Sequence, residues 1–278
     1  MPSQTIVVGP QADAHATTLA AALEHAAPGD TIVACAGVFE ETVHLPFNVT
    51  ITAAPVPEDS DDTDAAHATI IGTVIISANV TLDGLEVRGM TDVRKGHAIL
   101  EKCDVHHGSD GVRVHPGATA TVRNCRVHHC IAGGDGVYFM AGSFGEVTQT
   151  DIFECRVNAL HIQSSEAVLR ENRIRDCTFG VYYERKASGL CEQNTIEHVR
   201  KFGLYVTDGS DPVIRDNTVR WCGILCFFAS KGGRGTCSGN TFEGSLHVLA
   251  DCVVHLAENH VSGTADIDVA ASSVKVAG

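Results

Sequence analysis

Leu169-Arg-Glu-Asn172-Arg-Ile174 is the first of five stretches that share one pattern, an asparagine between two apolar positions. The other four are Cys191-Glu-Gln-Asn194-Thr-Ile196, Ile214-Arg-Asp-Asn217-Thr-Val219, Cys237-Ser-Gly-Asn240-Thr-Phe242 and Leu256-Ala-Glu-Asn259-His-Val261. The frame extends towards the N-terminus with its central position at Asp151, Cys125, Cys103 and Leu85. Successive central positions are 18 to 26 residues apart, and a period of about 22 is typical of a repeat architecture.

A second alternating run, opened by a small residue, accompanies the middle coils. These runs are Gly111-Val-Arg-Val114, Gly136-Val-Tyr-Phe139, Ala159-Leu-His-Ile162, Gly180-Val-Tyr-Tyr183 and Gly203-Leu-Tyr-Val206. Alternation over four or five residues predicts short strands with one buried face, and no helical segment separates them. Such strands bury their apolar face only when successive coils stack. We therefore predict an all-β fold, a single domain over residues 1–278 built as a right-handed parallel β-helix of about eleven coils.

The ends of the chain depart from the repeat. Residues 16–27 combine Thr18 as an N-cap with strong helix formers before Pro28-Gly29, which predicts one helix covering the N-terminal end, with coiling from Thr31 onwards. Residues 54–66 carry five acidic side chains and no apolar pattern, so we expect a protruding loop. Ile267-Asp-Val269 and Val274-Lys-Val276 predict an uncapped last coil, whose strand edge favours self-association or partner docking.

Charge and composition restrict the function classes. The 20 basic and 34 acidic residues give a net charge of −14, so we expect neither a nucleic-acid partner nor an anionic membrane. No apolar run reaches the roughly eighteen residues of a membrane span, and the first residues do not resemble a signal peptide. Eleven cysteines, an odd number, then predict reduced thiols and a cytoplasmic protein rather than a disulfide framework.

The stacking of coils explains why cysteine and asparagine recur at fixed positions of the repeat. Cys191 and Cys237 fall in a column that larger aliphatic residues fill elsewhere, so we interpret them as core residues. The asparagines at the central position fall where the chain turns. We expect their side chains to hydrogen-bond the backbone of neighbouring coils.

The sequence also resembles known families. Thr18-Leu-Ala-Ala-Ala-Leu23, Pro28-Gly-Asp-Thr-Ile32 and Gly37-Val-Phe-Glu-Glu-Thr-Val43 resemble the opening of pectin-lyase-like β-helices, a superfamily of sugar-active enzymes. Gly203-Leu-Tyr-Val-Thr-Asp-Gly-Ser-Asp-Pro-Val-Ile-Arg-Asp-Asn-Thr-Val219 resembles more closely the CASH (carbohydrate-binding and sugar hydrolase) repeats of β-helical F-box proteins. The resemblance covers about residues 17–262 and implies the substrate receptor of a ubiquitin ligase. We find no segment that reads as an F-box, the part that docks the ligase scaffold.

The catalytic motifs of sugar-active β-helices do not transfer to this sequence. Where a polygalacturonase-like motif places an acid after Asn-Thr, this chain has core residues such as Ile196. Asp211-Pro212 continues as Val213-Ile214 instead of the His-Glu of alginate epimerases, and no segment matches the Leu-Gly-Arg-Pro-Trp of pectin methylesterases. We therefore lean against an enzyme.

The outward positions of the second run are candidate binding residues. They are Arg113, Tyr138, His161, Tyr182 and Tyr205. Tyrosine and arginine are favoured anchors of protein interfaces, so we interpret this line as a binding surface. A solvated strand face without a ligand is the simpler alternative.

Asp110 and Asp135 precede the same runs, one coil apart, with Asn158 in the next coil. Two carboxylates roughly 5 Å apart beside His161 are compatible with retaining glycoside chemistry. Aspartate before glycine is also ordinary turn chemistry. Asp110, Asp135 and His161 are thus the catalytic set if the protein is an enzyme.

Two histidine pairs, His106-His107 and His128-His129, lie in register one coil apart. Imidazoles are ligands of Zn²⁺ and Cu²⁺. Neighbouring side chains on an extended strand point apart, however, so at most two rings converge without a bend. We predict stacked surface histidines that lower stability when they charge below about pH 6.5, and neither a metal nor another cofactor.

These observations favour a non-enzymatic protein-interaction or scaffold module that binds a protein partner. The first alternative is a carbohydrate-active enzyme, a glycoside hydrolase or polysaccharide lyase, that uses Asp110 and Asp135. The second is a structural rod in a large assembly.

Overall fold

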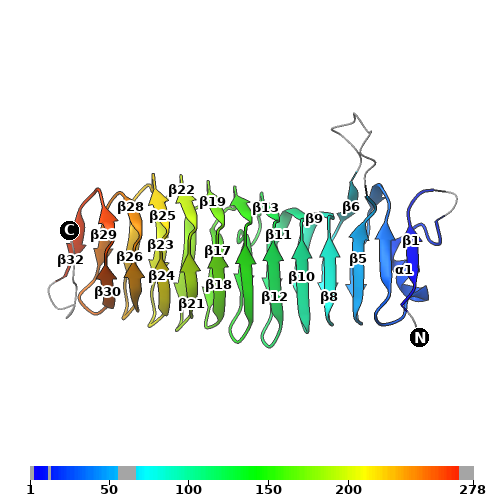
Figure 1. Cartoon of the computed structure of the whole chain (residues 1–278), viewed down its shortest axis with the longest axis horizontal. Coiled ribbons are helices and arrows are strands. Elements are labelled where there is room, and N and C mark those ends of the chain that lie inside the picture. Colours follow the sequence, from blue (N-terminus) through cyan, green and yellow to red (C-terminus); the bar gives the residue numbers. More distant parts are fainter. Residues whose placement is uncertain (1–2, 12–13, 56–66, 269–278) are drawn as a thin grey trace.

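The chain forms a parallel β-solenoid of about eleven turns, as the repeat predicts. The computed structural model describes residues 3–11, 14–55 and 67–268. Figure 1 shows the strands stacked side by side along the long axis, with β1 Thr5–Val8 and β32 Ala265–Ile267 at opposite ends of the rod. Neighbouring strands pair in parallel, so each coil lies directly on the one before it.

Three strand positions recur along the rod, and the first makes a separate sheet of twelve strands. In spatial order these are β1 Thr5–Val8, β2 Thr31–Ala34, β5 Val49–Ala53, β8 Val80–Asp83, β10 His97–Glu101, β12 Thr119–Arg123, β15 Phe144–Thr148, β18 Glu166–Arg170, β21 Ser188–Glu192, β24 Asp211–Arg215, β27 Arg234–Ser238 and β30 Val253–Ala257.

The other two positions are joined through the long strands β9 Glu86–Val93 and β11 Asp104–Val114, which run through both. We call them the second and third faces. The second face adds β3 Gly37–Phe39, β6 Ala68–Ile71, β13 Arg126–His128, β16 Asp151–Phe153, β19 Arg173–Arg175, β22 Thr195–Glu197, β25 Thr218–Arg220, β28 Thr241–Glu243 and β31 His260–Val261. The third face adds β4 Val43–Leu45, β7 Val74–Ile76, β14 Val137–Phe139, β17 Asn158–Gln163, β20 Phe179–Glu184, β23 Phe202–Val206, β26 Leu225–Ala229, β29 Leu246–Val248 and β32 Ala265–Ile267.

The core is a set of columns that run through the coils. Leu169, Cys191, Ile214, Cys237 and Leu256 follow one another in strand register and are all buried, which confirms the interpretation of the two cysteines as core residues. All eleven cysteines are free; ten are buried and Cys222 is half-buried.

A ladder of five asparagines, Asn172, Asn194, Asn217, Asn240 and Asn259, occupies the predicted turn position. The first four side-chain amides donate to the next Oδ1 at 2.8–2.9 Å. All five donate to a backbone carbonyl of a preceding coil, as at Asn217 Nδ2 to Cys191 O at 2.8 Å. The expected backbone bonding is thus confirmed. The position before Asn172 in the ladder is Thr150, whose N–H donates to Asn172 Oδ1, so the assignment of Asp151 to this column is wrong by one residue.

The N-terminal end contains a helix, α1 Leu19–His25, which packs against β1 and β4. Thr18 is its N-cap, as predicted, and Glu41 accepts the N–H groups of Leu19 and Ala20. The helix is shorter than residues 16–27 because Ala26 is already extended, and the Asp30 carboxylate accepts the N–H of Ala27 at 2.7 Å. Strand β1 pairs with β2, so the prediction that coiling begins at Thr31 is wrong by one strand.

Two predictions fall outside the described residues, namely most of the loop at residues 54–66 and the strand at Val274-Lys-Val276. The strand predicted at Ile267-Asp-Val269 begins earlier, as β32 Ala265–Ile267. Among the described residues, no helix is long and apolar enough to cross a membrane.

Candidate functional site

The five predicted binding residues form one continuous line on the third face. Strand register places Arg113 beside Tyr138, then His161, Tyr182 and Tyr205 on successive coils. Phe228 follows Tyr205 in the same register and continues the line, although the sequence analysis did not select it. We call Arg113, Tyr138, His161, Tyr182, Tyr205 and Phe228 the aromatic ridge. All six side chains are half-buried.

The rings of the ridge stack face to face along the rod. Centroid separations are 4.4 Å for Tyr138–His161, 5.1 Å for His161–Tyr182, 5.0 Å for Tyr182–Tyr205 and 5.2 Å for Tyr205–Phe228. Phe179 and Phe202 contact the same stack from the side. Because each inner ring has a neighbour on both faces, the ridge presents ring edges and hydroxyl groups to a ligand.

The hydroxyl groups of the ridge are held by hydrogen bonds. Tyr138 donates to Gln163 Oε1 at 2.8 Å, and Tyr182 donates to Glu184 Oε2 at 3.0 Å. Burial, reinforced by the negative charge of Glu184, raises the pKa of Tyr182 above its ordinary value. Both tyrosines therefore stay neutral donors, and their side chains are fixed before a ligand arrives.

The two predicted carboxylates lie on adjacent coils, but both are engaged by the protein itself. Asp110 accepts Arg113 Nε at 2.8 Å and the N–H of Asp135 at 3.1 Å. Asp135 accepts the N–H and Nδ2 of Asn158 at 3.1 and 2.7 Å, and its second oxygen lies 2.8 Å from His161 Nδ1. Both residues are more than nine-tenths buried. Their geometry is that of turn carboxylates that hold the base of the ridge.

His161 lies between two carboxylates at the centre of the ridge. Its Nδ1 faces Asp135, and its Nε2 lies 3.2 Å from Glu184 Oε1. Burial alone would raise the pKa of Glu184, but hydrogen bonds from Gln163 and Tyr182 and the nearby His161 hold that pKa below its ordinary value. Each ring nitrogen of His161 therefore faces a carboxylate, and the ring joins Asp135 to Glu184 across the ridge.

The histidine pairs lie on the second face. His106 and His107 precede the bend within β11, and His128 and His129 lie at the end of β13. His107 and His129 have positive φ values of 59° and 52°, and this bend brings the Nδ1 atoms of each pair to 2.5 Å (His106–His107) and 2.6 Å (His128–His129). Two nitrogen ligands of one tetrahedral zinc ion are about 3.3 Å apart, so the two Nδ1 atoms of each pair lie too close together to serve as ligands of one ion. The rings also stack between coils, as predicted, with centroids 4.9 and 5.1 Å apart. His106 and His128 are buried, however, so the prediction of surface histidines is wrong for these two residues. The sequence analysis missed the bend because neither residue is a glycine.

We expect the protein to lose stability as the pH falls from about 7.5 to about 5.5. Partial burial, together with the charges of His106, His129 and His128, lowers the pKa of His107 below its ordinary value. The unfolded chain therefore binds more protons than the folded protein below about pH 6.5, and stability falls in that direction. The carboxylates facing these rings, Glu86 and Asp104, have lowered pKa values and stay ionised over this range.

Thermal unfolding across this pH range checks the expectation. His107→Asn, which tolerates the positive φ, should reduce the fall in Tm, whereas His44→Asn on the exposed face of β4 should leave it unchanged. An unchanged Tm for the native protein over the whole range would contradict the prediction.

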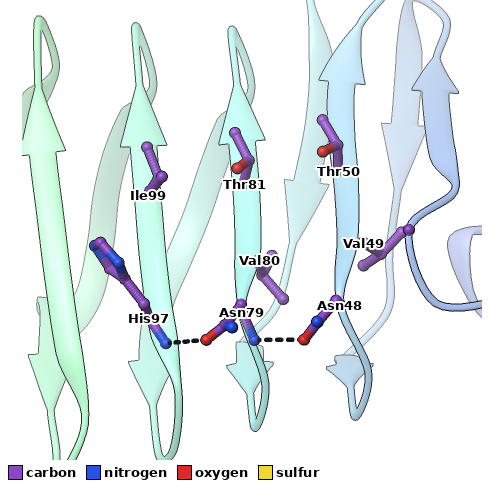
Figure 2. A pocket seen from close by; sticks show the side chains of 9 residues that line it. Asn48, Val49, Thr50, Asn79, Val80, Thr81, His97 and Ile99 are labelled. Carbon is purple, nitrogen blue, oxygen red and sulfur yellow. Dashed lines mark hydrogen bonds between the residues drawn. The ribbon is translucent and has the colours of Figure 1, made fainter.

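An open hollow lies on the first sheet, away from the ridge, and Figure 2 shows the side chains around it. Asn48 Oδ1 accepts the N–H of Asn79 at 3.1 Å, and Asn79 Oδ1 accepts the N–H of His97 at 2.9 Å (Figure 2). The amides thus bind the backbone of neighbouring coils, as in the asparagine ladder. We assign this hollow a structural role.

Fold and site together define a class: a parallel β-helix whose third face carries an outward aromatic ridge. The chain belongs to the right-handed β-helix family, whose model, described as "Right handed beta helix region", matches residues 63–189 and 133–265. The predicted handedness is therefore confirmed. No curated protein matches the sequence.

Solved structures with a similar fold include two lyases and an epimerase. Pectate lyase Pel9A has 12% identity and a TM-score of 0.60, over 99% of this chain and 82% of that one. The A-module of the mannuronan C-5 epimerase AlgE6 from Azotobacter vinelandii has 13% identity and a TM-score of 0.59, over 92% of both chains. Alginate lyase from Paenibacillus sp. str. FPU-7 has 14% identity and a TM-score of 0.58, over 95% of this chain and 97% of that one. At these identities the likeness shows the pectin-lyase-like fold alone.

Proposed function

We propose that the protein is a non-enzymatic recognition module that binds a protein partner through the aromatic ridge. The observation that carries the proposal is the continuous ring stack from Tyr138 to Phe228, which spans five coils. Its rings and hydroxyl groups are already fixed by stacking and hydrogen bonds, so binding loses little side-chain entropy. Tyrosine, phenylalanine and arginine are enriched at the centres of protein interfaces.

The geometry of the ridge favours a protein over a sugar chain as ligand. A sugar ring packs on the open face of an aromatic ring, whereas the inner rings here are covered on both faces by their neighbours. The carboxylates of Asp110 and Asp135 are buried and bonded to Arg113, His161 and backbone N–H groups. A recognition role agrees with the resemblance to the substrate-receptor β-helix of F-box proteins, and the eleven free thiols support a reducing, cytoplasmic location.

Affinity capture from the source cell, followed by titration of the purified partner, tests the proposal. We expect Tyr182→Ala/Tyr205→Ala to weaken binding by at least about 100-fold, since two interface anchors are lost. The matched control is Val213→Ala/Val253→Ala, two exposed valines of the first sheet, which should bind like the native chain. A partner held equally by all three proteins would place the binding surface elsewhere and refute the assignment.

A second candidate function is a carbohydrate-active enzyme, a hydrolase or lyase. The observation that favours it is the cluster in which His161 bridges Asp135 and Glu184, because linked titratable groups are the usual material of acid–base catalysis. Incubation with polyuronates and neutral oligosaccharides distinguishes the two. Turnover that Asp110→Asn/Asp135→Asn abolishes would establish the enzyme, and the absence of turnover would leave recognition as the function of the ridge.

A further inference from the structure

Three potential metal ligands lie together at the C-terminal end of the rod. His247 on β29 is in register with Asp266 on β32, and Asp268 follows two residues later. One ring nitrogen and one oxygen of each carboxylate all lie within 4.8 Å of one another. The group therefore joins the last two coils of the third face, beyond the aromatic ridge.

Among the described residues, His247 Nε2 has no hydrogen-bond partner. His247 Nε2 is buried, and it lies 3.6 Å from Asp266 Oδ2 and 3.9 Å from Asp268 Oδ1, beyond hydrogen-bond range. His161, which also faces two carboxylates, approaches them to 2.8 and 3.2 Å. The spacing at His247 thus leaves a gap that the equivalent cluster on the ridge does not have.

The charge at this cluster is also unlike that of the middle coils. There, acidic side chains pair with arginines one coil away, as Glu197 does with Arg173 and Arg220. In the part of the chain that the structure describes, the ion pairs of Asp266 and Asp268 are both with His247. Two carboxylates thus converge on one imidazole, and a cation between them would neutralise the excess negative charge.

We propose that His247, Asp266 and Asp268 bind a divalent first-row transition-metal ion of the zinc type. One imidazole nitrogen and two carboxylate oxygens suit Zn²⁺ or Co²⁺ better than Ca²⁺ or Mg²⁺, which prefer oxygen alone. Ligand atoms of a tetrahedral ion are about 3.4 Å apart. His247 Nε2 lies 3.6 and 3.9 Å from the two carboxylate oxygens, so it needs to approach them by only a few tenths of an ångström, and the two oxygens, within 4.8 Å of each other, close around the ion. The N–H of Ala250 binds Asp268 Oδ2 at 3.2 Å and orients the other oxygen towards the gap. The bound ion links β32 to β29 and stabilises the last described coil. This proposal differs from the prediction, made from the sequence, that the protein holds no metal.

Titration of metal-free, tag-free protein tests the proposal. Isothermal titration with Zn²⁺ should show one ion per chain at this site, and Co²⁺ should give the visible absorption of a four-coordinate ion. Zn²⁺ should also slow amide exchange in residues 246–268. Affinity should fall at least about tenfold in His247→Ala and in Asp266→Asn/Asp268→Asn, and it should be retained in His260→Ala, an exposed histidine of the same end.

The exchange footprint separates this site from the histidine pairs. Protection confined to residues 104–129, or binding that persists unchanged in the Asp266→Asn/Asp268→Asn protein, would overturn the proposal. So would the absence of any bound ion. The asparagine variants remove carboxylates from half-buried or exposed positions, and unchanged circular dichroism in the metal-free state would confirm that they fold.

Discussion

Asn217→Ala should lower the free energy of unfolding by about 4 kcal/mol, a large effect for one polar residue. Asn217 is 1% exposed. Its Nδ2 donates to Asn240 Oδ1 and Cys191 O, and its Oδ1 accepts the N–H and Nδ2 of Asn194. Alanine leaves these partners buried without water or protein to replace the lost bonds. Each unsatisfied buried group destabilises by about 1–3 kcal/mol.

Asn259→Ala is the matched control because Asn259 ends the described ladder. It is half-buried, donates to Cys237 O and accepts the N–H and Nδ2 of Asn240, so it makes three of these bonds instead of four, and water can reach the groups that a substitution leaves unpaired. Urea unfolding followed by circular dichroism should rank the two variants, with a loss of about 1–2 kcal/mol for Asn259→Ala. Equal losses, or a loss below about 1 kcal/mol for Asn217→Ala, would show that the ladder does not hold the coils together.

The sequence repeat predicts the coils because its period is set by the residues that must face the core once in every coil. Residues such as Ile214 must face inward on every coil, so their spacing in the sequence equals the length of one coil. The ridge residues follow from the same alternation. Tyr182 and Tyr205 point outward because their neighbours Tyr183 and Val206 point into the core. The sequence pattern does not distinguish Thr150 from Asp151 as the residue of the asparagine column, because the two are adjacent and both are polar.

Other features depend on contacts that no local pattern records. The short strand β1 carries only four residues of alternation and is stabilised by its pairing with β2. The bend at His107 requires a positive φ in a residue that rarely adopts one, so the convergence of the histidine rings was not foreseen. Glu184 was not selected as a site residue, although it follows Tyr182 by two residues and therefore shares its outward face.

His161→Phe should lower the free energy of unfolding by about 3 kcal/mol even though it keeps an aromatic ring between Tyr138 and Tyr182. The substitution removes both ring nitrogens, and it leaves Asp135 and Glu184, whose side chains are only 10% and 13% exposed, without their shared basic partner. Removing the hydrogen-bond partner of a buried carboxylate destabilises by more than the bond itself contributes, because the carboxylate stays desolvated with its bond unmade.

A double-mutant cycle separates this charge effect from ring stacking. Adding Glu184→Gln to His161→Phe should restore about 1 kcal/mol, because the remaining uncompensated charge at Glu184 is removed, whereas Glu184→Gln alone should destabilise the native protein. Tyr205→Phe is the control for the ridge, since it loses only the bond to Ser230 Oγ at 3.1 Å and should cost at most about 1 kcal/mol. If the effects of His161→Phe and Glu184→Gln on the free energy of unfolding are additive, His161 acts through packing alone. Coupling of the expected sign would show that the Asp135–His161–Glu184 cluster holds the rings of the ridge in place.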